Sequence, residues 1–138
     1  MTKHKYIVLF THGYNDGNDK NGIYLYDQKL DIHDIAQLKL SAELVALCSC
    51  NSGIGEAKPG GSVNALNRAF ILVGASNVVY SLIDVDEKCT INLLKDAGVQ
   101  VKKGLSYSRA IRNAQLKMIK KKGYDPFDWC GYTLLGNI

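Results

Sequence analysis

One histidine and one cysteine stand where they could act together on an acyl group. His12 and Cys50 each closely follow a short apolar segment, residues 6–10 and residues 44–47 respectively. A cysteine attacks as its thiolate, and a neighbouring imidazole can take the thiol proton and later deliver it to a leaving amine. The pair therefore indicates nucleophilic catalysis if the fold brings the two side chains together.

The elements that must position these side chains are short strands. Residues 6–10, 44–47 and 77–82 are apolar without alternation, which is typical of parallel strands covered on both faces. Residues 132–135 are a fourth candidate strand, and residues 23–26 a short outlying strand or hairpin arm.

Helical patterns lie between the strands. We expect helices over residues 63–73 and 87–97, each followed by a glycine, and a third from an N-cap at Ser106 through residue 122. Alternating strands and helices predict an α/β fold with a mostly parallel sheet and helices on both faces. The length of 138 residues predicts one domain spanning residues 1–138.

In open sheets of this kind, ligands bind beyond the carboxyl ends of the strands. His12, Cys50 and Asp84 each follow a different predicted strand, so we expect them at one edge. The Gly13 N–H carries no side chain over it and, with the Cys50 N–H, could donate to a developing oxyanion.

Ordered blocks along almost the whole chain resemble the CHAT domain, a family of caspase-like cysteine proteases. They read LCSCNSGIG (47–55), AFILVGA (69–75), VVYSLIDVD (78–86), AIRNAQ (110–115) and WCGYTLLG (129–136). The resemblance implies a caspase-like three-layer sandwich and a Cys–His dyad acting on a polypeptide. His12 would be the general base and acid, Cys50 the nucleophile, and Gly13 an oxyanion donor. No metal or organic cofactor is implied.

Asp84 has two interpretations. The run LIDVDE is similar to the separase pattern L-W-D-V-T-D, whose first aspartate lies in the pocket for a basic P1 residue, so Asp84 would select Arg or Lys there. Alternatively, Asp84 caps the helix that begins near Glu87.

Members of the family carry strands ahead of the histidine strand, whereas Met1 stands close to His12 here. We therefore expect a sheet that lacks one or two N-terminal strands, as in a truncated chain, with an open edge beside His12. The alternative function is an inactive interaction module that a partner chain or a second copy joins through this edge. Some relatives need a partner for activation.

Two other site chemistries have weaker support. Cys48 shares a strand face with Cys50, but a single C-x-C is a poor zinc motif. The glycine-rich loop 53–62 invites comparison with phosphate-binding loops, but it fits neither the dinucleotide-binding nor the P-loop pattern. A small ligand-binding doubly wound domain is therefore only a third, weaker interpretation. We expect Cys89 and Cys130 to pack in a helix and a strand, and His33 to face solvent.

Composition excludes several classes. Hydrophobic residues make up 46% and charged residues 22%, as in globular domains rather than disordered chains or coiled coils. The net charge of +4 is mild, and most of the excess lysines and arginines fall where we expect the solvated face of a helix. No aromatic residues that could stack on bases accompany them, so we expect no nucleic-acid partner. No apolar run is long enough to span a membrane and no secretory signal is evident, which predicts the reducing cytoplasm.

Overall fold

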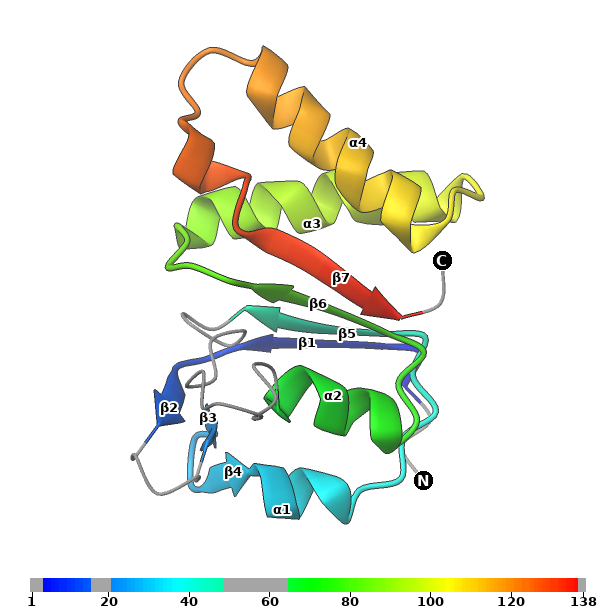
Figure 1. The fold of residues 1–138 in the computed structure, drawn as a ribbon. Coiled ribbons are helices and arrows are strands. Elements are labelled where there is room, and N and C mark those ends of the chain that lie inside the picture. Colours follow the sequence, from blue (N-terminus) through cyan, green and yellow to red (C-terminus); the bar gives the residue numbers. More distant parts are fainter. Residues whose placement is uncertain (1–3, 16–20, 49–64, 137–138) are drawn as a thin grey trace, which may run out of the picture.

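The computed structural model describes residues 4–15, 21–48 and 65–136, which form a four-stranded sheet with helices on both faces (Figure 1). The strand order is β1-β5-β6-β7, with β1, β5 and β6 parallel and β7 antiparallel to β6. The strands are β1 (Tyr6–Phe10), β5 (Leu44–Cys48), β6 (Asn77–Ser81) and β7 (Tyr132–Gly136). The mostly parallel α/β prediction is confirmed.

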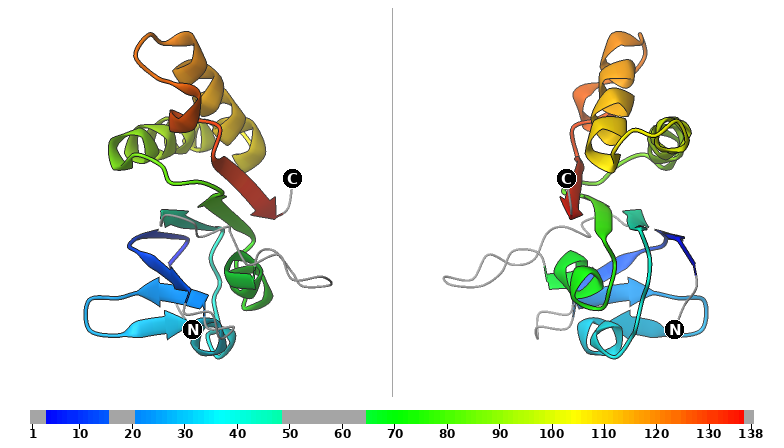
Figure 2. Two further views of the ribbon diagram at one scale, coloured as in Figure 1. Left: turned by 60° about the vertical axis from the view of Figure 1, so that its left-hand side comes forward. Right: turned by 90° about the vertical axis from the view of Figure 1, so that its right-hand side faces the viewer.

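Two helices cover each face of the sheet (Figures 1 and 2). One face carries α1 (Ile32–Ala36) and α2 (Ala65–Leu72), and the other carries α3 (Glu87–Lys102) and α4 (Tyr107–Lys120). Because side chains alternate along a strand, Val45 and Leu47 pack toward the α1/α2 side while Ala46 packs toward α3 and α4. The result is two buried cores divided by the sheet.

Helix α3 begins at Glu87 as predicted, but its capping residue and its C-terminal end differ from the prediction. The capping residue is Asp86, whose carboxylate accepts a hydrogen bond from the Cys89 N–H at 3.0 Å, so the interpretation of Asp84 as the cap is wrong. The helix also continues past Gly98 to Lys102. Gly98 is exposed, and the buried face resumes beyond it at the half-buried Val101, so packing outweighs the cost of one helical glycine.

Helix α4 follows its prediction closely. Ser106 occupies the N-cap position, although its side chain makes no capping hydrogen bond. The predicted apolar stripe is buried, comprising Ala110, Ile111, Ala114 and Met118. The basic residues around it are exposed, as predicted for a solvated face: Lys102, Lys103, Arg109, Arg112, Lys117, Lys120, Lys121 and Lys122.

No helix in the described ranges has both the length and the apolar character needed to cross a bilayer.

A second, antiparallel sheet follows β1 and was only partly predicted. It consists of β2 (Gly13–Asn15), β3 (Asn21–Tyr24) and β4 (Lys29–Asp31) in the order β2-β3-β4. The Lys29 ammonium lies 5.0 Å from the Tyr14 ring centroid and 5.3 Å from that of Tyr24, a cation–π arrangement. Only β3 was expected, because the three-residue strands β2 and β4 give too little alternation to detect.

Strand β1 is covered on one face only, contrary to the prediction. Its alternate residues Tyr6, Val8 and Phe10 are 48%, 51% and 45% exposed. They lie on the face that α3 and α4 cover farther along the sheet, and among the described residues β1 pairs with β5 alone. Within the described ranges, the apolar run is therefore an edge strand, as expected.

The sequence also predicted the environments of Cys89, Cys130 and His33. Cys89 is buried in α3 and His33 is exposed in α1, as predicted. Cys130 is exposed in the turn between the short helix η1 (Pro126–Asp128) and β7, so the prediction that it packs in a strand is wrong.

Candidate functional site

The carboxyl ends of β1, β5 and β6 meet at one edge of the sheet, and register fixes how they align. Phe10 of β1 is paired with Cys48 of β5, and Leu47 of β5 is paired with Tyr80 of β6. His12 lies two residues beyond the first of these pairs. The parallel register therefore places the residues that leave each strand at a common edge, where ligands bind in open α/β sheets.

Two contacts with Tyr24 hold the backbone around His12. The Tyr24 N–H donates to the His12 carbonyl at 2.9 Å, and the Thr11 hydroxyl donates to the Tyr24 carbonyl. The His12 side chain itself is exposed. The small antiparallel sheet thus anchors the turn that carries the imidazole and leaves the ring accessible.

Gly13 is the first residue of β2 and is partnered with Ile23 of β3. The hydrogen bond from Tyr24 to His12 makes this a non-hydrogen-bonded pair, in which neither residue donates to the other. The Gly13 N–H is therefore not used by β3 and is directed away from it.

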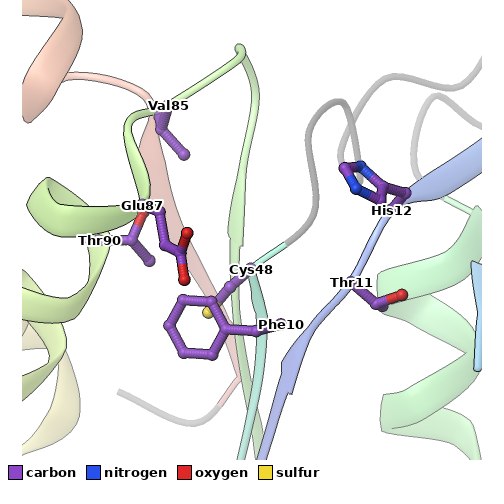
Figure 3. Close-up of a pocket in the computed structure, with 7 residues that line it drawn as sticks. All are labelled: Phe10, Thr11, His12, Cys48, Val85, Glu87 and Thr90. Carbon is purple, nitrogen blue, oxygen red and sulfur yellow. The ribbon is translucent and has the colours of Figure 1, made fainter. Parts of the chain in front are cut away.

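A groove of about 350 Å³ lies at this edge, between the turn after β1 and the start of α3 (Figure 3). Thr11 and His12 stand on one side of it, and Val85, Glu87 and Thr90 on the other. Phe10 and Cys48 lie between the two sides. The size is within the range of ligand-binding clefts.

Cys48 in this groove is a thiol rather than a thiolate. Burial raises its pKa to about 12, because a buried anion loses its hydration. A raised pKa lowers the fraction of thiolate near neutral pH and so disfavours Cys48 as a nucleophile.

The acidic residues after β6 have different environments. Asp84 is exposed and is not among the described residues that line the groove, Asp86 caps α3, and Glu87 lines the groove. Figure 3 shows the Glu87 carboxylate directed toward Cys48 and Phe10. Sequence reasoning missed Glu87 because an acid in the first turn of a helix has an ordinary role in stabilising the helix dipole.

Beside the Glu87 side of the groove, a buried hydroxyl pair ties α3 to β7. The Thr90 hydroxyl donates to the Asp86 carbonyl at 2.9 Å, so the Tyr132 hydroxyl, 2.5 Å away, is the donor to Thr90. Burial raises the pKa of Tyr132 to about 12. The start of α3, and with it Glu87, is thus fixed to the sheet.

Cys50 and the glycine-rich loop 53–62 lie outside the described residues. Of the described ones, no three His, Cys, Asp or Glu side chains are grouped so as to hold a metal ion.

The sequence was compared with known families and proteins. A family model described as the CHAT domain matches residues 1–137, almost the entire chain. No protein with a curated description matches the sequence.

Proposed function

The chain belongs to the CHAT domain family, a caspase-like, peptidase-related family, and on that premise we propose that it is a cysteine endopeptidase with a dyad of His12 and Cys50. The observation that carries the proposal is the register of β1 and β5, which pairs Phe10 with Cys48. His12 and Cys50 each follow these partners by two positions in the sequence. Neighbouring strands are about 4.8 Å apart. If the two segments keep their alignment for two more residues, the His12 imidazole and the Cys50 sulfur would lie on adjacent positions of one sheet face.

In the proposed reaction, the Cys50 thiolate attacks the carbonyl carbon of the scissile peptide bond while His12 holds the thiol proton. The tetrahedral oxyanion accepts hydrogen bonds from the N–H groups of Gly13 and Cys50. The C–N bond then breaks, and the imidazolium gives its proton to the departing amine. His12 next takes a proton from water, whose hydroxyl attacks the thioester carbon, and the sulfur leaves as thiolate.

Three features support these roles. The His12 ring is exposed and its backbone is anchored through Tyr24. The Gly13 N–H is not used by β3. The raised pKa of Cys48 disfavours it as the nucleophile and is consistent with that role for Cys50. A free thiol nucleophile suits the reducing cytoplasm.

The finer parts of the proposal concern fold and specificity. We assign the four-stranded sheet with helices on both faces to the caspase-like sandwich, in one domain. The substrate is a polypeptide, and an acidic side chain after β6 selects Arg or Lys at P1. Asp84 is the residue that the sequence nominates for this selection.

A panel of fluorogenic peptides that differ only at P1 tests the activity. We expect cleavage by the wild-type chain and none by Cys50→Ala or His12→Ala. The absence of cleavage across the panel, or cleavage that survives Cys50→Ala, would refute the peptidase assignment.

The exposed edge of β1 favours a second candidate function, a non-enzymatic interaction module. Tyr6, Val8 and Phe10 are arranged symmetrically about Val8, so antiparallel pairing of two copies would set each Tyr6 opposite the partner's Phe10. A self-complementary patch of this kind is what a two-fold dimer requires. The module would therefore join a second copy of the chain through β1.

A further inference from the structure

Among its described lining residues, the groove beside His12 has one carboxylate together with apolar and uncharged polar side chains. Phe10 and Val85 provide the apolar surface, and Glu87 provides the charge. Figure 3 shows the Glu87 carboxylate turned into the groove rather than away from the protein. A site of this composition would bind a side chain that is apolar along its length and cationic at its end.

We propose that this groove is the recognition pocket for an arginine or lysine side chain of a polypeptide, and that Glu87 is its specificity-determining residue. The inference rests on the proposed function for its substrate class, and it assigns the selection to Glu87 in place of Asp84. The methylene stem of the ligand packs on Phe10 and Val85, as long basic side chains do on apolar surfaces. The guanidinium or ammonium group then meets the carboxylate.

The position of Glu87 is fixed by its surroundings. It is the first residue of α3, whose cap is the Asp86 carboxylate bound to the Cys89 N–H. One turn later, Thr90 is bonded both to the Asp86 carbonyl and to Tyr132 of β7. These bonds fix the backbone from which the Glu87 side chain extends, and the side chain is exposed, so a cation can reach its carboxylate from solvent.

The nearest alternative is that Glu87 only stabilises the helix N-terminus. An acid in the first turn does so without regard to any ligand. Glutamine at this position would then change stability slightly and leave peptide binding unaltered. The two roles are therefore separable by measuring ligand preference rather than stability.

Binding can be measured without catalysis in the Cys50→Ala chain. The probes are acetylated tetrapeptide amides that differ only in their last residue, which is arginine, lysine, norleucine or glutamate. We expect the arginine and lysine peptides to bind more tightly than the norleucine peptide. Adding Glu87→Gln should lower their affinity by about 10- to 100-fold and leave the norleucine peptide unchanged. Adding Asp27→Asn, which makes the same change in net charge at an exposed turn between β3 and β4, should leave every affinity unchanged.

Equal affinities for the four peptides, or a basic preference that survives Glu87→Gln, would overturn the inference. Loss of the preference on Asp84→Asn alone would return the role to Asp84 and also overturn it. The cleavage panel decides the peptidase assignment separately. Selective binding of basic peptides without cleavage would refute the peptidase assignment and uphold the pocket. Cleavage whose P1 preference is unchanged by Glu87→Gln would uphold the peptidase assignment and refute the pocket.

Discussion

Phe10 and Cys48 are register partners at the carboxyl ends of β1 and β5. The parallel ladder between β1 and β5 ends at this pair, and β1 is followed by the turn that carries His12. His12 follows the first partner by two residues, and it lines the same groove as the second. The relationship connects two segments far apart in the sequence at the edge where the chemistry is proposed.

The buried Thr90–Tyr132 pair predicts a measurable coupling between α3 and β7. Thr90→Val keeps the side-chain volume but leaves the buried Tyr132 hydroxyl without its partner, so the free energy of unfolding should fall by about 1–3 kcal/mol. Tyr132→Phe should cost less, because Thr90 keeps its bond to the Asp86 carbonyl. Urea unfolding of both single variants and the double variant measures the coupling. Strictly additive losses would contradict the hydrogen bond.

Two glycines predict opposite effects of the same substitution. Gly74 has φ +111°, and a Cβ there would meet the Leu40 carbonyl oxygen, so Gly74→Ala should lower the free energy of unfolding by more than about 1 kcal/mol. Gly98 lies within α3 with open space around it, so Gly98→Ala should raise that free energy by about 0.5–1 kcal/mol. Thermal unfolding of the two variants tests both; effects of the same sign would contradict the described backbone.

The same two glycines show what sequence could predict. Gly74 was expected to end α2 and does so, because its positive φ follows the last helical turn. Gly98 was expected to end α3 and does not, because the helix continues to Val101, which packs against the same buried cluster as Leu93 and Ala97. Strand cores and helix stripes could be predicted from local pattern. The uncovered face of β1 could not, since it depends on which elements lie over it.

In the candidate site, too, some features could be predicted from local sequence and others depend on the tertiary structure. His12, Cys50 and Asp84 were expected together at one strand edge from their positions after apolar runs. The structure brings His12 to the groove beside Cys48, whereas Asp84 is not in the described lining and Cys50 lies outside the described residues. Glu87 and Phe10 were not identified, because a first-turn acid and a strand aromatic each have an ordinary structural explanation. Their shared location is a property of the tertiary arrangement, which no local pattern contains.

The Asp86 cap predicts a pH-dependent contribution to stability. The hydrogen bond from the Cys89 N–H lowers the pKa of this carboxyl in the folded chain. Its stabilising effect is therefore complete above the unfolded pKa, which is near 3.9, and is lost as the pH falls through the lower folded value. Wild type should be more stable than Asp86→Ala at pH 7, with a gap that narrows below about pH 4.

Urea titrations of the two proteins across this pH range measure the gap. Asp27→Ala removes an exposed carboxylate from the turn between β3 and β4 and is the reference for loss of charge alone. A gap for Asp86→Ala that is constant with pH would contradict the cap.

The open edge of β1 predicts self-association if the chain acts as an interaction module. Val8→Lys adds a charge at the centre of the exposed stripe, which blocks edge-to-edge pairing of strands. As an exposed substitution it should change the free energy of unfolding by no more than about 0.5 kcal/mol. Sedimentation over a range of concentrations should show a wild-type dimer and a Val8→Lys monomer. A wild-type monomer at every concentration would contradict the second candidate function.

The reactivity of Cys50 toward iodoacetamide, followed by peptide mass spectrometry, tests the dyad most directly. Cys130 is exposed and provides a reference thiol in the same chain, while Cys48 and Cys89, each with a pKa raised to about 12 by burial, should react slowly. We predict that at pH 6–7 Cys50 reacts about tenfold or more faster than Cys130, and that His12→Ala removes the difference. A Cys50 that reacts no faster than Cys130, or whose rate is unchanged in His12→Ala, would contradict the dyad.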